Sequence, residues 1–287
     1  MERQSASPPA GGVAPGVTVG VIGTGNMGSA LVRGWARALG PGVRLLVWDK
    51  LPSAAERVAD CAGVAAADSP AQLVAEAAFV IVVVKPKDGD ELLRSLAPLF
   101  REGQMVVSSM AGVELEQIRR ACGPIPVLFR VMPNLGVAVG AGMIAVAAEE
   151  GTNAESEQQV VELFDALGTA LLVPESALDT VTAVSGTGPA LLALALEGLE
   201  DGGVAAGLPR ASARMFARAA MLGAARTLVA GDASAAELQQ RLVYSAEPIQ
   251  EGLSVLRERG VRQAFVQAVE AASRRARQMR APSGGTG

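Results

Sequence analysis

The chain has 287 residues, of which half are hydrophobic and 19% are charged, and its formal net charge is −4. This length favours two domains over one, because single hydrophobic cores stop growing at roughly 250–300 residues. There is no basic excess of the kind that nucleic-acid-binding surfaces carry. The sequence contains no histidine, which excludes every histidine-based triad, general base and metal site.

The two ends of the chain differ in composition from the rest. Residues 1–16 are rich in Pro, Gly, Ala and Ser and lack a hydrophobic segment, so they predict a disordered tail and not a signal peptide. Residues 281–287 predict a second tail. No apolar run approaches the about 20 residues that span a bilayer, because Gly, Pro or a charge interrupts each one. We therefore expect a cytoplasmic protein without a membrane or nucleic-acid partner.

Residues 17–174 alternate between short β-branched runs and stretches with helical spacing. A helix predicted at 154–167 has Asn153 as its N-cap. Apolar strands separated by helices indicate a mostly parallel sheet covered on both faces, so this region predicts a doubly wound Rossmann domain. The predicted strands are residues 17–22, 43–48, 79–84, 105–108, 127–131, 143–147 and 170–173.

A glycine-rich segment follows the first predicted strand and precedes a helix that runs to residue 39. Gly23 allows a tight turn, Gly25 lets the backbone approach a pyrophosphate, and Gly28 lets the helix pack close to the strand. Free N–H groups at the helix start would face the phosphates. The segment therefore predicts a site for NADPH or NADH, formed by Gly23, Thr24, Gly25, Asn26, Met27 and Gly28.

Further candidate cofactor residues follow later predicted strands. A carboxylate at Asp49 would bind the ribose 2′-hydroxyl of NADH. Lys50 could instead neutralise the 2′-phosphate of NADPH, or it could be a solvated charge, so the choice of cofactor stays open. Lys85 follows a strand at the edge where open α/β sheets bind ligands. After the next strand, the small residues Ala111 and Gly112 leave room for the nicotinamide.

Residues 175–280 contain no strand-like run and are dominated by Ala, Leu and Arg. Such apolar helices expose more surface than one copy can cover, so we expect a helical domain that forms dimers and contributes to the substrate site. The predicted helices are residues 177–183, 189–206, 209–229, 234–243, a segment from 249 onward, and 262–278, with breaks at 186–189, 207–209 and 231–232.

A row of hydrogen-bond donors precedes the second of these helices. Ser185 and Thr187 offer hydroxyl groups, and Gly186 and Gly188 expose their backbone N–H groups ahead of Pro189. A concave row of donors at the start of a helix suits a carboxylate. The alternative is a turn that serves only packing.

Five motifs occur in the order in which pyrroline-5-carboxylate reductases carry them, and from residue 17 to 277 the chain resembles that family. The resemblance implies a Rossmann domain, a helical dimerisation domain, and hydride transfer from NAD(P)H to the C=N carbon of a cyclic imine in proline biosynthesis. It also implies that Val84, Pro86 and Asn134 contact the cofactor and that residues 185–189 hold the substrate carboxylate. The motifs are residues 23–28, Val84-Lys85-Pro86, Ala111-Gly112-Val113, Arg130-Val131-Met132-Pro133-Asn134 and residues 181–190.

The chain departs from the family pattern where the family carries Ser-Pro-Gly-Gly-Thr-Thr. Here residues 245–250 read Ser-Ala-Glu-Pro-Ile-Gln, one residue shorter and without the threonine that the family places at the imine nitrogen. We expect Ser245, Tyr244 or Glu247 to replace it, Glu247 as a carboxyl group whose pKa is raised by burial. Glu247 could equally be a solvated loop charge.

The substrate that these changes predict is pyrroline-5-carboxylate or a bulkier or decarboxylated cyclic imine. Two other functions remain open on the sequence alone. One is a different NAD(P)-dependent oxidoreductase, such as a hydroxyacid or ketone reductase, on the same scaffold. The other is a partner protein that binds the cofactor but is inactive.

Overall fold

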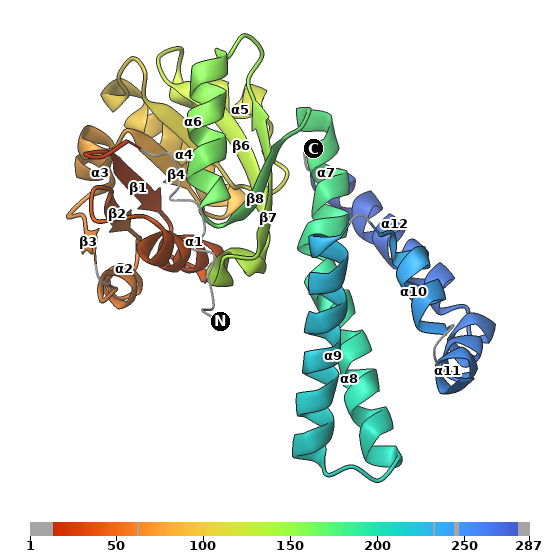
Figure 1. Ribbon diagram of the computed structural model, residues 1–287. Coiled ribbons are helices and arrows are strands. Elements are labelled where there is room, and N and C mark those ends of the chain that lie inside the picture. The colour runs from red at the N-terminus through yellow and green to blue at the C-terminus, as the bar shows by residue number, and fades with distance from the viewer. Residues whose placement is uncertain (1–13, 62, 232, 244–246, 281–287) are drawn as a thin grey trace. The chain divides into compact units, whose positions relative to one another are not determined.

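The computed structural model describes residues 14–61, 63–231, 233–243 and 247–280 (Figure 1). These residues form two compact units. The first contains residues 14–186 and 273–280, and the second contains residues 187–272. Residues 1–13 and 281–287, which hold most of the two predicted tails, lie outside the described part.

One sheet of eight strands, in the order β3-β2-β1-β4-β5-β6-β7-β8, organises the described part of the first unit. The first six strands are parallel, β7 is antiparallel to β6, and β8 is parallel to β7. The predicted mostly parallel Rossmann sheet is confirmed. The strands are β1 Thr18–Ile22, β2 Arg44–Trp48, β3 Val64–Ala66, β4 Phe79–Val82, β5 Met105–Ser108, β6 Val127–Pro133, β7 Gly142–Ala148 and β8 Gly168–Leu172.

Helices cover both faces of this sheet, as the apolar strands require. Phe79 and Ile81 of β4 pack in one core with helices α1, α2 and α6, and Val80 and Val82 pack in the other with α3, α4 and α5. The helices are α1 Asn26–Ala38, α2 Pro52–Ala59, α3 Pro70–Glu76, α4 Pro86–Leu96, α5 Leu115–Cys122 and α6 Ala154–Asp165, with 3-10 turns η1 Ala97–Leu99 and η2 Leu135–Val139.

The buried indole of Trp35 joins α1 to α6. Its Nε1 donates a hydrogen bond to the Leu163 carbonyl oxygen at 2.8 Å, and its ring meets Phe164 edge to face at 5.3 Å. The Asn153 side chain accepts a hydrogen bond from the backbone N–H of Ser156 at 2.8 Å. This bond confirms the predicted N-cap of α6.

The segment after β8 is helical, and within the predicted break at 186–189 the helix type changes at Thr187, a turn residue between two helical elements. A 3-10 turn η3 (Glu175–Ala177) leads into α7 (Leu178–Val181), a π-helix η4 (Thr182–Gly186) and α8 (Gly188–Ala205). Pro189 fits here because the first turn of a helix does not need its missing N–H group. Gly186 therefore ends the π-helix, and Gly188 begins α8. Short π-helical segments are frequent at functional sites.

The described part of the second unit contains helices only (Figure 1). It comprises α8, α9 (Arg210–Ala230), α10 (Ala235–Val243), α11 (Glu247–Glu258) and the first part of α12 (Val261–Arg280). The predicted break at 207–209 is confirmed, since Gly207 has a φ of +102° between α8 and α9. The helices α8 and α9 pack against each other.

One helical run corrects the sequence expectation about membrane spans. The run Glu175–Ala205 is long and apolar enough to cross a bilayer by length and composition alone, and only 6% of its most apolar stretch is buried. An apolar helix with this exposure needs a covering partner, which can be a membrane or another protein surface.

Candidate functional site

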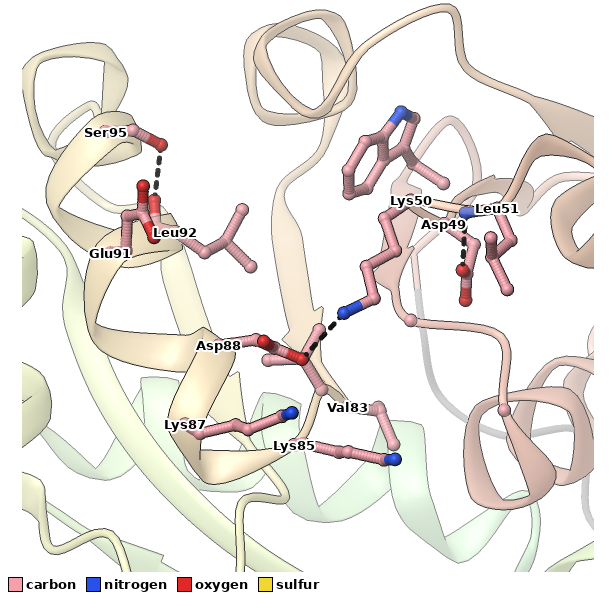
Figure 2. Close-up of a pocket in the computed structure, with 14 residues that line it drawn as sticks. Asp49, Lys50, Leu51, Val83, Lys85, Lys87, Asp88, Glu91, Leu92 and Ser95 are labelled. Carbon is pink, nitrogen blue, oxygen red and sulfur yellow. Dashed lines mark hydrogen bonds and ion pairs between the residues drawn. The ribbon is translucent and has the colours of Figure 1, made fainter.

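A cleft of about 670 Å³ opens at the carboxyl ends of β1, β2 and β4 (Figure 2). This is where the strand order reverses direction between β1 and β4, the position at which open α/β sheets bind their ligands. The cleft brings together the glycine-rich loop, the end of β2 and the start of α4. The lining residues are Gly23, Gly25, Trp48, Asp49, Lys50, Leu51, Val83, Val84, Lys85, Lys87, Asp88, Glu91, Leu92 and Ser95.

The three glycines of the loop have different surroundings. Gly23 has a φ of +99°, and a Cβ atom there would lie 2.4 Å from the Val83 carbonyl oxygen. A Cβ atom at Gly28 would lie 1.9 Å from the Gly23 oxygen. No atom lies within 4 Å of a Cβ position at Gly25. The first two glycines therefore allow the turn and the close helix, whereas Gly25 leaves space for a ligand.

The start of α1 is suited to an anion. Asn26 and Met27 are its first residues, and Gly25 is an N-cap without a side-chain hydrogen bond. The first turn contains no acidic residue. Its backbone N–H groups and the positive end of the helix dipole can therefore bind the pyrophosphate of a dinucleotide.

The Asp49 carboxylate is bound to the protein's own backbone. Its Oδ2 accepts hydrogen bonds from the Thr24 backbone N–H at 2.7 Å and from the Thr24 hydroxyl at 3.1 Å. Its Oδ1 accepts one from the Leu51 N–H at 2.9 Å. Asp49 therefore ties the end of β2 to the glycine-rich loop.

Lysine side chains reach into the cleft from two elements. The Lys50 ammonium forms an ion pair with Asp88 of α4, with Nζ and Oδ2 2.9 Å apart (Figure 2). Lys85 is the N-cap of α4, and Lys87 is in its first turn. The Lys50 ammonium lowers the pKa of the Asp88 carboxyl below its ordinary value, and Lys87 and Lys85 act in the same direction.

The other candidate residues of the first unit follow β4, β5 and β6. Because these strands are parallel neighbours, Val84, Ala111 and Asn134 lie along the same edge of the sheet. Pro86 opens α4 as its first residue.

Asn134 and Ser185 meet, although they are far apart in the sequence. The Asn134 side-chain amide donates to the Ser185 hydroxyl oxygen at 3.0 Å and to the Ser185 carbonyl oxygen at 3.3 Å. The Asn134 Oδ1 accepts from the N–H groups of Gly136 and Met143. The amide is thereby fixed, and the Ser185 hydroxyl keeps its own proton for another acceptor.

The remaining predicted residues belong to the second unit or are outside the description. Thr187 precedes α8, which Gly188 and Pro189 begin. Tyr244 and Ser245 lie outside the described residues. Glu247 is exposed at the start of α11. Within the described part of the chain, Glu247 therefore lacks the burial that its expected role as a proton donor requires.

Sequence reasoning missed several residues that line the cleft. Lys87, Asp88 and Trp48 were not among the candidates, although Lys87 is one of only three lysines in the chain. The sequence feature that could have identified them is that all three lysines closely follow the ends of two predicted strands. Recognising it required knowledge that β2 and β4 flank β1 in the sheet.

Two family models match the chain. Residues 175–279 match pyrroline-5-carboxylate reductase dimerisation, and residues 18–112 match NADP oxidoreductase coenzyme F420-dependent. The first match covers the apolar run Glu175–Ala205. The description of this family model favours a protein surface as the partner that covers this helix.

Relatives of known name resemble the chain over most of its length. The pyrroline-5-carboxylate reductase of Synechocystis sp. is 38% identical over 200 residues, or 70% of this chain and 74% of the relative. That of Methanosarcina acetivorans is 32% identical over 91% of this chain and 97% of the relative. The pyrroline-5-carboxylate reductase of Escherichia coli is 30% identical over 88% of this chain and 94% of the relative.

Solved structures share the fold. A pyrroline-5-carboxylate reductase from Coxiella burnetii has a TM-score of 0.82 at 25% identity, covering 92% of this chain and 98% of the other. The Plasmodium falciparum pyrroline carboxylate reductase with NADP bound has a TM-score of 0.79 at 24% identity over the same shares.

Proposed function

The chain belongs to the pyrroline-5-carboxylate reductase family, and from this premise we propose that it reduces pyrroline-5-carboxylate to proline with NADPH or NADH. The similarity to the Methanosarcina acetivorans enzyme over 91% of the chain carries this proposal. The cleft supports it independently, because Gly25 leaves open space beside the free N–H groups of α1. The residues present thus fit a dinucleotide.

A nicotinamide cofactor bound in this site supplies the hydride that reduces the imine carbon. The chain's own contribution is binding and orientation. The start of α1 neutralises the pyrophosphate, and Gly23 and Gly28 shape the loop that lets it approach. Small residues at Ala111 and Gly112 leave the nicotinamide face accessible to the substrate.

We propose that Ser185 helps to bind the substrate carboxylate. Its hydroxyl oxygen accepts the Asn134 amide proton at 3.0 Å, which orients the hydroxyl and leaves its proton available. The imine nitrogen also needs a proton, and without histidine we propose Glu247, Ser245, Tyr244 or a water molecule that they hold as its source.

We propose that the protein is a cytoplasmic homo-oligomer built from dimers. The match to the dimerisation family supports this, as do the many exposed apolar side chains of α8 and α9. Burying such side chains against a second copy removes apolar surface from water. Those exposed by about half or more are Leu192, Leu194, Leu199, Met215, Phe216, Leu222 and Val229.

The test is oxidation of NADPH and of NADH, followed by absorbance, with pyrroline-5-carboxylate, carboxylate-free 1-pyrroline and larger cyclic imines. We expect turnover with pyrroline-5-carboxylate and formation of proline, identified by chromatography. Turnover of only the carboxylate-free or larger imines would assign a different substrate to this reductase. Binding of cofactor without reduction of any imine would overturn the proposed activity.

A further inference from the structure

The side-chain carboxamide of Asn134 uses its hydrogen-bonding capacity on the protein itself. Its oxygen accepts from the backbone N–H groups of Gly136 at 3.1 Å and of Met143 at 3.3 Å. Its nitrogen donates to the hydroxyl oxygen of Ser185 at 3.0 Å and to the Ser185 carbonyl oxygen at 3.3 Å. Because a carboxamide oxygen has two lone pairs and its nitrogen has two protons, these bonds fix which end faces Ser185 and occupy the whole group.

The carbonyl oxygen of Ser185 needs a donor from outside its own helix. In an α-helix it would accept from the residue four positions later, which is Pro189 and has no N–H group. In a π-helix the partner would be the N–H group of Ala190, but this group donates to the Thr187 carbonyl oxygen at 3.0 Å. A partly buried carbonyl group without a donor is costly. The amide of Asn134 therefore takes the place of the N–H group that proline lacks.

The loop that carries Asn134 is built around the carboxamide oxygen. A Cβ atom at Gly136 would lie 2.4 Å from the Ala141 carbonyl oxygen and 3.0 Å from Asn134 Oδ1. The Gly136 carbonyl oxygen accepts from the Ala141 N–H group at 3.0 Å, which closes the turn. Backbone groups thus hold the oxygen end of the carboxamide, and its nitrogen end has little freedom to turn away from Ser185.

The same amide group sets the direction of the Ser185 hydroxyl. Because the hydroxyl oxygen accepts from Asn134, its own proton must point away from the carboxamide. We propose that Asn134 is a positioning residue, which replaces the N–H group that Pro189 lacks and thereby directs the Ser185 hydroxyl proton toward the substrate carboxylate. The inference rests on the proposed function in that Ser185 binds this carboxylate. It gives the Asn134 side chain a role in the substrate site in place of contact with the cofactor.

The first test measures stability and needs no reaction. Pro189→Ala restores an N–H group that can donate to the Ser185 carbonyl oxygen. Asn134→Ala should therefore lower the midpoint of urea unfolding less in the Pro189→Ala background than in the natural sequence. The control is Asn153→Ala, which removes the N-cap bond to Ser156 and should cost the same in both backgrounds. Equal losses for Asn134→Ala in the two backgrounds would overturn the proposed replacement.

The second test measures recognition of the carboxylate. Asn134→Asp keeps the shape and the accepting oxygen but replaces the amide donor with an acceptor, so the Ser185 proton should turn toward it. We expect KM for pyrroline-5-carboxylate to rise at least about tenfold, the loss typical of a hydrogen bond to a charged group. KM for carboxylate-free 1-pyrroline and the calorimetric dissociation constant of NADPH should not change. An equal rise for both imines, or weaker binding of NADPH, would contradict the positioning role.

A double substitution separates positioning from simple charge repulsion, because the new aspartate also carries a negative charge. Ser185→Ala should raise KM for pyrroline-5-carboxylate by a similar factor. If Asn134 acts through Ser185, adding Asn134→Asp to Ser185→Ala should have no further effect. If the aspartate repels the substrate directly, the second substitution should raise KM again, and the inference would be wrong.

The two tests also distinguish this inference from the proposed function. A protein that reduces pyrroline-5-carboxylate with a KM insensitive to Asn134→Asp would keep the proposed function and overturn the inference. A protein that reduces neither imine would contradict the proposed function, and coupled unfolding of the variants at 134 and 189 would still establish the replacement of the missing N–H group.

Discussion

Gly25 and Gly28 lie three residues apart in the glycine-rich loop and differ in what surrounds them. A methyl group at Gly25 would project into open space, where a pyrophosphate is expected to pass. A methyl group at Gly28 would overlap the Gly23 carbonyl oxygen. A side chain at Gly25 should therefore affect cofactor binding, whereas a side chain at Gly28 should affect the stability of the fold.

We predict that Gly25→Ala weakens binding of both cofactors at least about tenfold while lowering the free energy of unfolding by less than about 1 kcal/mol. Gly28→Ala should instead destabilise the fold by about 1–3 kcal/mol, the usual cost of overpacking. Calorimetric cofactor titration and urea unfolding followed by circular dichroism would measure the two effects. Unchanged affinity in folded Gly25→Ala would contradict the assignment of the loop.

At this scale the turn of the glycine-rich loop could be predicted from the sequence, whereas the ion pair and hydrogen bonds within the cleft could not. The glycines are readable because each has a local steric reason within a strand–turn–helix segment. The partner of Lys50 is not readable, because Asp88 is 38 positions away and meets it only through the strand order of the sheet. Likewise, the Asp49 side chain bonds to Thr24, which no local pattern indicates.

Among the elements, β6 is joined to the start of the helical region by an ion pair. The Arg130 guanidinium is only 2% exposed and donates to Glu175 Oε1 at 2.6 Å. The same oxygen accepts from the Leu115 backbone N–H at 2.7 Å, at the start of α5. One carboxylate therefore connects β6, α5 and η3.

Removing this carboxylate leaves a buried positive charge without its ion-pair partner. We predict that Glu175→Ala lowers the free energy of unfolding by at least about 2 kcal/mol, because an unpaired buried charge is costly. The control Glu116→Ala removes an exposed pair with Arg120 and should cost less than about 1 kcal/mol. Denaturant titrations of both variants provide the comparison, and equal costs would show that water compensates Arg130 fully.

The helix α11 begins with Glu247, for which two roles are possible. An acidic residue in the first turn interacts favourably with the helix dipole and would affect stability alone. A proton donor to the imine would affect turnover. The exposure of Glu247 within the described chain does not by itself provide the burial that a proton donor needs.

We predict that Glu247→Gln reduces turnover of the true imine substrate at least about tenfold, as loss of a positioned proton donor does. Glu251→Gln, one turn later on the same helix, is the matched control and should retain activity. Efficient reduction of pyrroline-5-carboxylate by Glu247→Gln would show that the loop is a tolerated variation.

For the molecule as a whole, the order of strands and helices followed from the sequence because continuous apolar runs mark buried parallel strands. The strand β3 was missed because it has only three residues, of which two are alanines, and alanine is depleted in strands. The break expected at 186–189 is a change of helix type at Thr187 and not a loop, because Pro189 lies at the start of α8, where proline does not interrupt a helix. Gly and Pro residues within a helical sequence can therefore mark a change from one type of helix to another as well as a loop.

The exposed apolar surface of α8 and α9 has the character of an interface. Leu194 and Phe216 are 68% and 58% exposed, although such side chains are normally buried when a partner is present. Stable dimers bury about 1,200–2,000 Å² of surface, and two adjacent helices of 18 and 21 residues are long enough to contribute a large share of it. Association through these helices would also cover the run Glu175–Ala205 without a membrane.

We predict a homo-oligomer at micromolar concentration, with a mass of at least twice the 29.2 kDa chain in light scattering. Leu194→Glu and Phe216→Glu should each shift the protein toward monomer, because a charge on the apolar face must be desolvated when two copies meet. Ile125→Glu places the same charge on an exposed apolar position of the first unit and should leave the mass unchanged. A monodisperse monomer for the natural sequence would contradict the prediction and would leave the apolar helices to another partner, with a lipid bilayer as the first to test by vesicle flotation.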